Sequence, residues 1–143
     1  MNNNIFVIAE HYRDGIPDIV SEMLGQARRL AQLSGGEVTA ILPACEPENL
    51  APRLVGAHRV ICIKDETLRY YSPEAWQSAI EPILRDATPG LVMVGSTSMG
   101  LDLAAALSTR LAIPMVSACI DLRLEDDTYH LTSQLYGGKL LLD

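Results

Sequence analysis

The sequence has few aromatic residues and few positive charges, and both shortages exclude classes of ligand. Its 143 residues include five Tyr, one Phe and one Trp, too few for the stacked-ring platform that binds single-stranded nucleic acid. Lys and Arg number 11 against 18 Asp and Glu, which gives a formal net charge of −7. An acidic chain does not create the positive field that attracts nucleic acid or an anionic membrane. We therefore expect no nucleic-acid partner and no membrane insertion.

Long apolar runs, targeting segments and cysteine pairs are also missing. No apolar run reaches the roughly 18 residues that would indicate a membrane span, and the Asn-rich N-terminus has no basic region typical of a signal peptide. Cys45, Cys62 and Cys119 are too far apart for a redox or zinc-binding cysteine pair. Their odd number, in apolar surroundings, predicts reduced thiols buried in the core of a cytoplasmic protein.

Apolar runs of strand type alternate with segments of helical periodicity along most of the chain. Hydrophobic residues make up 48% and charged residues 20%, a balance typical of one folded domain. The alternation predicts a doubly wound α/β domain with a mostly parallel sheet. We expect strands at residues 5–9, 38–42, 60–63, 91–94 and 113–116, and helices at 18–34, around 50–55, from Ser72-Pro73 onward and after Gly100.

The pattern changes near the C-terminus. Residues 119–124 and 129–136 alternate apolar and polar side chains on either side of the acidic segment 125–127. Such alternation is typical of strands with one face in solvent. We expect an antiparallel hairpin that extends the α/β domain.

A crevice at the sheet's carboxyl edge is the candidate ligand site, because doubly wound sheets bind ligands where the winding reverses. If the strands at 5–9 and 91–94 pair, the loops at residues 10–13 and 96–99 meet there. Hydroxyl and amide groups in the second loop could contact a nucleotide, although the evidence for each residue is weak. The candidate cofactor-binding residues are Gly95, Ser96, Thr97, Ser98 and Met99.

A phosphate-binding loop is disfavoured at this position. Gly95 and Gly100 have the glycine spacing of a P-loop, but Leu101 and Asp102 stand where Lys and Ser or Thr are needed. Asp102 is expected in the first turn of the following helix, where its carboxylate would compete with phosphate for free amides. A capped helix behind a tight turn is the favoured interpretation.

Catalysis is also disfavoured. Ser98 is a near match to the nucleophile of a GxSxG elbow, with His11 and either Glu10 or Asp14 as partners, but Ser96 replaces the first glycine. Hydroxyls in such loops usually cap helices. We expect no catalytic residues. No metal site is indicated either, because the histidines lie on separate segments without a second ligand nearby: His11, His58 and His130.

Two features of the sequence are consistent with a protein partner. Tyr70, Tyr71 and Trp76 form an aromatic cluster that either packs the start of a helix or anchors a partner. The mean hydropathy of +0.14 favours a surface that is partly covered by another chain or domain.

Four segments, in this order, together resemble the N-terminal domain of the electron transfer flavoprotein alpha subunit. They are residues 7–11 with 13–15, residues 33–40, residues 95–104, which are similar to the family's GxTSxGRDLxPR stretch, and residues 136–139, which match its YGGK turn. The resemblance implies an adenine-nucleotide-alpha-hydrolase-like fold. It also implies a heterodimer with a beta-like subunit, and FAD that carries electrons from an acyl-CoA or related dehydrogenase to an acceptor.

The same resemblance implies that FAD binding and partner docking belong to different domains. FAD in this family is held mainly by a C-terminal domain, which this sequence lacks, so we expect residues 1–143 to be a single scaffold and partner-docking domain that does not hold FAD alone. A stand-alone adenine-nucleotide-binding module, with AMP as ligand, is the alternative. Family arginines are replaced at three places, which removes any ionic contacts they make: Leu101, residues 105–106 and residues 134–135.

Overall fold

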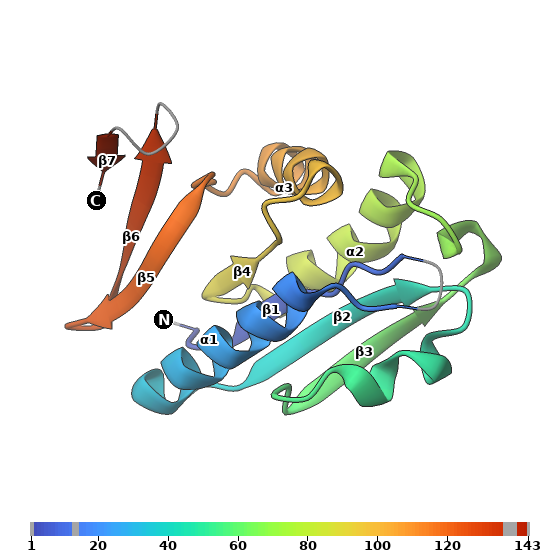
Figure 1. Cartoon of the computed structure of the whole chain (residues 1–143), viewed down its shortest axis with the longest axis horizontal. Helices are drawn as coiled ribbons and strands as arrows, with labels where there is room; N and C mark the ends of the chain where they lie inside the picture. The colour runs from blue at the N-terminus through green and yellow to red at the C-terminus, as the bar shows by residue number, and fades with distance from the viewer. Residues whose placement is uncertain (1, 13–14, 136–139, 143) are drawn as a thin grey trace.

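A four-stranded parallel sheet forms the centre of the molecule. The computed structural model describes residues 2–12, 15–135 and 140–142. The strand order is β3-β2-β1-β4 (Figure 1). Strand β1 pairs on one side with β2 and on the other with β4, so Ile5 faces both Val38 and Leu91. The predicted central pairing of the first and fourth strands is confirmed. The bounds are β1 Ile5–Ile8, β2 Val38–Ala44, β3 Arg59–Lys64 and β4 Leu91–Met93.

Helices cover both faces of this sheet, as a doubly wound fold requires. Side chains of β1 alternate between the faces: Ile5 and Val7 pack with α1, whereas Phe6 and Ile8 pack with α2 and α3. The winding reverses between β1 and β4, which places the expected crevice at the carboxyl ends of these strands. The bounds are α1 Asp18–Ser34, α2 Pro73–Ala87 and α3 Ser98–Leu111.

Local sequence signals set the ends of the helices. Ser72 caps α2 by accepting a hydrogen bond from the Ala75 amide, and Pro73 occupies the first helical position. Gly35 ends α1 in the left-handed region, with φ of 73°, and its amide donates to the Ala31 carbonyl. Both helix boundaries are therefore consistent with the sequence patterns.

The C-terminal hairpin is confirmed and belongs to a second, antiparallel sheet. Strands β5 (Cys119–Glu125), β6 (Thr128–Leu135) and β7 (Leu140–Leu142) lie side by side in that order. The turn between β5 and β6 has positive φ at Asp126 and Asp127, as in two-residue hairpin loops. The YGGK turn lies outside the described residues.

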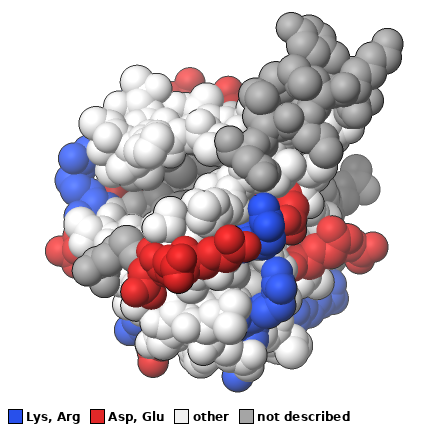
Figure 2. All heavy atoms as spheres, turned by 90° about the vertical axis from the view of Figure 1, so that its left-hand side faces the viewer, with Lys and Arg blue, Asp and Glu red and all other residues white. Residues whose placement is uncertain are grey.

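This second sheet rests on α1. The Gln26 side chain donates to the Leu122 carbonyl over 2.7 Å, and Leu122 itself is buried in the core under α1. Figure 2 shows the end of the molecule that lies to the left in Figure 1, where a band of Asp and Glu is crossed by a few Lys and Arg. The acidic composition is thus visible on this surface.

The predicted strand at 113–116 is wrong. The amide of Ile113 donates to the Ser108 carbonyl, and its carbonyl accepts from the Ser108 hydroxyl. Pro114 has no amide hydrogen to add to a ladder. The end of α3 therefore uses the polar groups that a fifth strand would need, and the segment runs past β4 without joining the sheet.

Two other expectations need correction. The short helix expected around 50–55 is a pair of 3-10 turns, η1 (Pro47–Asn49) and η2 (Ala51–Arg53), because Pro47 and Pro52 interrupt an α-helical ladder. The cysteines are free, but Cys62 and Cys119 are exposed and Cys45 is half-buried. Cys62 lies on the edge strand β3 and Cys119 begins the outer sheet, so neither is in the core.

Among the described residues, no helix combines the length and apolar character needed to cross a membrane.

Candidate functional site

The two loops of the expected crevice meet through one buried contact. Glu10, which follows β1, is 3% exposed. The Thr97 hydroxyl donates to Glu10 Oε2 over 2.7 Å and accepts from the Gly100 amide at 3.0 Å. Thr97 therefore caps α3 and joins it to the end of β1. The two loops meet where the sequence predicts, and the hydrogen bond between Thr97 and Glu10 joins them.

Close packing requires a glycine at position 100 but not at position 95. A Cβ on Gly100 would lie 1.9 Å from the Gly95 carbonyl oxygen, and a Cβ on Gly95 would lie 3.4 Å from Glu10 Oε1. Real Cβ atoms do not approach backbone oxygen as closely as the first distance. Gly100 thus serves the turn between β4 and α3.

Asp102 does not cap α3, which corrects the prediction from sequence. The helix begins at Ser98 with no acidic residue in its first turn, so Asp102 lies in the second turn. There its carboxylate accepts a hydrogen bond from the Tyr71 hydroxyl over 2.5 Å. Partial burial, together with this bond, raises the pKa of Tyr71. Asp102 therefore links α3 to the loop that precedes α2.

Glu10 is unfavourable for the pyrophosphate of FAD. The carboxyl oxygens of Glu10 are hydrogen-bond acceptors, as phosphate oxygens are, and they already take the Thr97 hydroxyl. Glu10 Oε1 has no hydrogen-bond partner among the described residues, so it adds a second acceptor at this place. Ser96 and Ser98 are exposed, and Met99 is buried in the core beneath α3.

The arrangement does not support a Ser98 nucleophile. His11 is buried, its Nε2 bonds to the Pro43 carbonyl over 2.8 Å, and its ring packs 5.4 Å from that of Trp76. Within the described ranges, no hydrogen bond joins Ser98 to His11, and no group of three His, Cys, Asp or Glu could hold a metal ion. His11 is thus held at the end of β2, away from the role that a triad needs.

The aromatic cluster divides between core and surface. Trp76 is fully buried and makes an edge contact with Tyr71, with 5.6 Å between ring centres. Tyr70 is 69% exposed. Helix-start packing therefore accounts for Tyr71 and Trp76. His11 also contacts Trp76. Sequence spacing could not predict this contact, because His11 comes from a distant segment.

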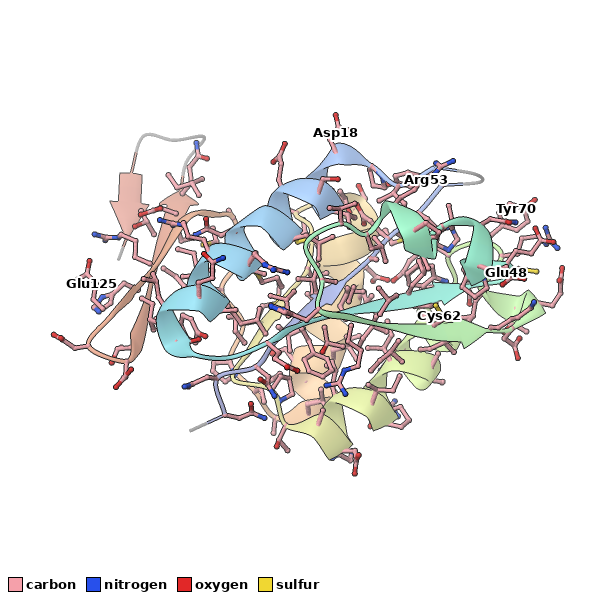
Figure 3. The ribbon with its side chains drawn as sticks, turned by 90° about the horizontal axis from the view of Figure 1, so that it is seen from below. Asp18, Glu48, Arg53, Cys62, Tyr70 and Glu125 are labelled. Atoms are coloured by element: carbon pink, nitrogen blue, oxygen red, sulfur yellow. The ribbon has the colours of Figure 1, made fainter. Side chains whose placement is uncertain are left out.

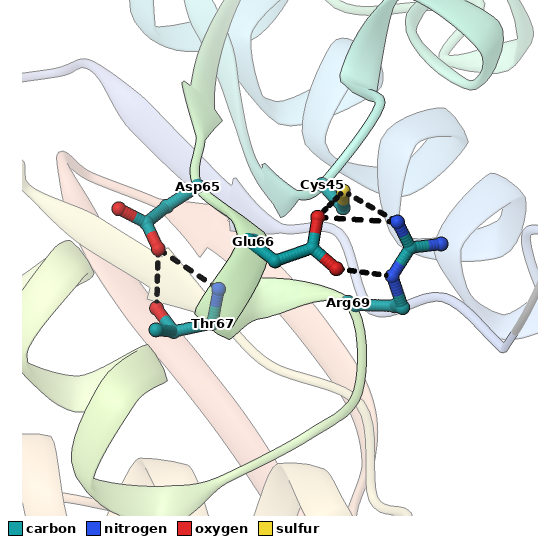
Figure 4. A network of polar contacts seen from close by, with 5 residues as sticks. All are labelled: Cys45, Asp65, Glu66, Thr67 and Arg69. Carbon is teal, nitrogen blue, oxygen red and sulfur yellow. Dashed lines mark hydrogen bonds and ion pairs between the residues drawn. The ribbon is translucent and has the colours of Figure 1, made fainter.

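A polar network lies at the ends of β2 and β3 (Figure 4). The Cys45 thiol donates to Glu66 over 2.8 Å, and the Arg69 guanidinium contacts Glu66 at 2.8 Å and Cys45 Sγ at 3.1 Å. Hydrogen bonds from Arg69 and then from Cys45 lower the pKa of Glu66 to about 2. The hydrogen bond to Glu66 raises the pKa of the Cys45 thiol.

Two adjoining apolar grooves separate the parallel sheet from the outer sheet. One, of about 400 Å³, lies between β4, α3 and the segment 113–117. The other, of about 360 Å³, lies between β4, α1 and β5. Val116 lines both grooves. Exposed large apolar side chains surround them: Leu101, Ile113, Met115, Val116 and Ile120.

Comparison with known proteins assigns the family. The electron transfer flavoprotein domain model matches residues 5–142. The chain is 34% identical to the electron transfer flavoprotein subunit alpha of Megasphaera elsdenii, over 97% of this chain and 42% of the relative. It is 30% identical to the same subunit of Thermoanaerobacterium thermosaccharolyticum, over 96% of this chain and 43% of the relative.

A more distant relative is the acryloyl-CoA reductase electron transfer subunit beta of Anaerotignum propionicum, 25% identical over 88% of this chain and 35% of that protein. The chain spans less than half the length of these curated relatives. The domain match and the two alpha-subunit relatives carry the assignment. The chain belongs to the electron transfer flavoprotein family and is related to its alpha subunits.

Proposed function

We propose that this chain is the scaffold and partner-docking domain of an electron-transfer-flavoprotein-like alpha subunit. The subunit would belong to an FAD-dependent carrier that passes electrons from a dehydrogenase to an acceptor. The observation that carries the docking role is the set of exposed apolar side chains that line the two grooves beside β4. Contiguous apolar surface of this kind is typical of an interface.

The edge of the parallel sheet adds to this docking surface. Within the described part of the chain, β4 pairs only with β1, and the segment 113–117 passes it without strand pairing. The grooves therefore combine apolar walls with the backbone of an edge strand, and a partner could satisfy both. We assign the partner as a beta-like subunit, since the closely matching relatives are named as alpha subunits. The acryloyl-CoA reductase relative supports an acyl-CoA or related dehydrogenase as the electron donor.

The flavin would be held mainly outside this domain. The hydrogen bond between Thr97 and Glu10 lies where the winding of the sheet reverses, and Glu10 contributes acceptors rather than donors there. No described contact at this crevice favours the alternative of a stand-alone AMP-binding module. When FAD is bound in the full complex it supplies the redox chemistry; the residues of this chain support and dock.

Replacing Val116 with Asp tests the docking role. A carboxylate placed between the two grooves would lose its water when the beta-like subunit binds, and we expect the affinity to fall by roughly a hundredfold. The matched control is Val55→Asp, since Val55 is a valine that is 80% exposed and lies outside both grooves. Isothermal titration of each variant with the beta-like subunit of the same organism gives the affinities. Equal affinities for the two variants would contradict the proposed docking surface.

A further inference from the structure

We propose that the beta-like subunit docks by adding one strand to the parallel sheet beside β4. This mode of binding rests on the docking role proposed above. The added segment is extended, presents apolar side chains toward α3 and carries Lys or Arg among the side chains that point toward α1. Segments that pair with an open sheet edge gain affinity from main-chain hydrogen bonds and specificity from alternate side chains.

The backbone of β4 presents hydrogen-bonding groups on the side that faces away from β1. Within the described residues, β1 is the one strand that pairs with β4. The Gly90 amide donates to the Asn4 carbonyl at 3.0 Å, and successive amides of an edge strand point alternately toward the sheet and away from it. The amides of Leu91 and Met93 therefore point away from β1, where an added strand would accept from them.

The two apolar grooves beside β4 lie on opposite faces of the sheet. Leu91 and Met93 pack with the core under α1, on the side of the 360 Å³ groove. Val92 and Val94 pack with the core under α2 and α3, on the side of the 400 Å³ groove. All four side chains are half-buried, whereas those of β1 are buried. Because successive side chains of a strand point to opposite faces, a strand beside β4 would fill both grooves in turn.

The opposite edge of the sheet carries charged side chains, and the β4 edge does not. Arg59 and Lys64 are exposed at the two ends of β3, and Lys64 donates to Glu48 at 2.7 Å. Glu48 and Cys62, which Figure 3 labels, lie on this side of the molecule. Charged side chains, Lys above all, commonly protect an edge strand against pairing. The residues of β4 are Leu, Val and Met, so this edge is suited to a partner strand.

The charged residues that line the grooves are acidic and belong to one groove. Glu22 from α1 and Asp121 from β5 line the groove on the α1 side, whereas the described lining of the other groove has no charged residue. Asp121 already pairs with Arg123 at 3.1 Å. Glu22, which is exposed, is thus the carboxylate that a Lys or Arg of the added strand would meet. Charge pairs of this kind contribute mainly to specificity and to the association rate.

Hydrogen exchange of single amides tests the added strand. It is followed by NMR on the chain alone and on the chain bound to the beta-like subunit. We expect the amides of Leu91 and Met93 to exchange roughly a hundredfold more slowly in the complex. Ile61 is the control, because the His58 amide donates to the Val38 carbonyl and the Ile61 amide by alternation points away from β2. Its exchange should not change.

The Val116→Asp variant separates this inference from the docking role on which it rests. If the variant weakens the complex, but Leu91 and Met93 exchange equally fast in the unsubstituted complex and in the free chain, strand addition is wrong and the docking surface stands. If the variant binds as tightly as the unsubstituted chain, the docking role itself is wrong. Slower exchange in the chain alone as its concentration rises would assign the edge to a second copy and overturn the proposal.

Replacing Met93 with proline removes one outward amide. Proline is tolerated on edge strands where the N–H faces away from the sheet, so β4 can still pair with β1. We expect the affinity for the beta-like subunit to fall roughly tenfold. Met93→Leu keeps the amide and nearly the same side-chain volume, and should bind as the unsubstituted chain does. Circular dichroism melts verify that both variants fold. Equal affinities of the two variants would contradict the proposal.

Discussion

Replacing Gly100 with alanine is expected to lower the free energy of unfolding by about 3 kcal/mol. The new methyl group would lie 1.9 Å from the Gly95 carbonyl oxygen. That oxygen belongs to the backbone between β4 and α3, so it cannot move aside as a flexible side chain can. The start of α3 would have to shift, and the contact between Thr97 and Glu10 would be disturbed with it. Urea denaturation followed by circular dichroism measures the loss.

A second glycine provides the matched control. Gly25 lies in the exposed part of α1, and a Cβ there would have no neighbour within 4 Å. Gly25→Ala should raise the free energy of unfolding by about 0.5–1 kcal/mol, because alanine is the better helix former. If both substitutions were stabilising, the packing account of the residue 95–100 turn would be wrong.

Truncating Trp76 to alanine should cost about 4 kcal/mol. Its side chain is fully buried in the core beneath α2 and α3, between the rings of His11 and Tyr71. The cavity left behind would remove support from the end of β1, because His11 packs directly on the indole. Since Trp76 is the one tryptophan of the chain, unfolding has to be followed by circular dichroism rather than by its fluorescence.

Trp76→Phe separates packing from hydrogen bonding. The indole Nε1 has no hydrogen-bond partner among the described residues, so phenylalanine loses no polar contact and keeps an aromatic ring in the stack. We expect it to cost less than half as much as alanine. A phenylalanine variant as unstable as the alanine variant would show that the indole donor has a role that these contacts do not include.

Local patterns predicted the main elements well, because burial follows periodicity. The alternation in β1 distributes Ile5 and Phe6 to opposite faces, and the caps at Ser72 and Gly35 use side-chain and backbone chemistry that sequence alone specifies. The same patterns failed at residues 113–116. An apolar run has the composition of a strand whether or not its backbone groups are already bonded to the preceding helix.

Contacts between distant segments could not be predicted in the same way. Asp102 has the sequence position of a capping residue, but Thr97 takes that role and Asp102 bonds to Tyr71. Arg53 and Arg69 line one cleft although sixteen positions separate them, and no local spacing brings them together. The meeting of the two loops was predictable because it follows from the strand order. The hydrogen bond between Thr97 and Glu10 could not be predicted, since the two residues lie 87 positions apart in the sequence.

The most direct test of the central claim is flavin retention by the chain itself. The purified 143-residue chain is incubated with excess FAD and desalted, and its visible absorption spectrum is recorded. A domain that supports and docks, with Glu10 and Thr97 bonded to each other at the crevice, should retain no flavin. One FAD retained per chain would contradict this account.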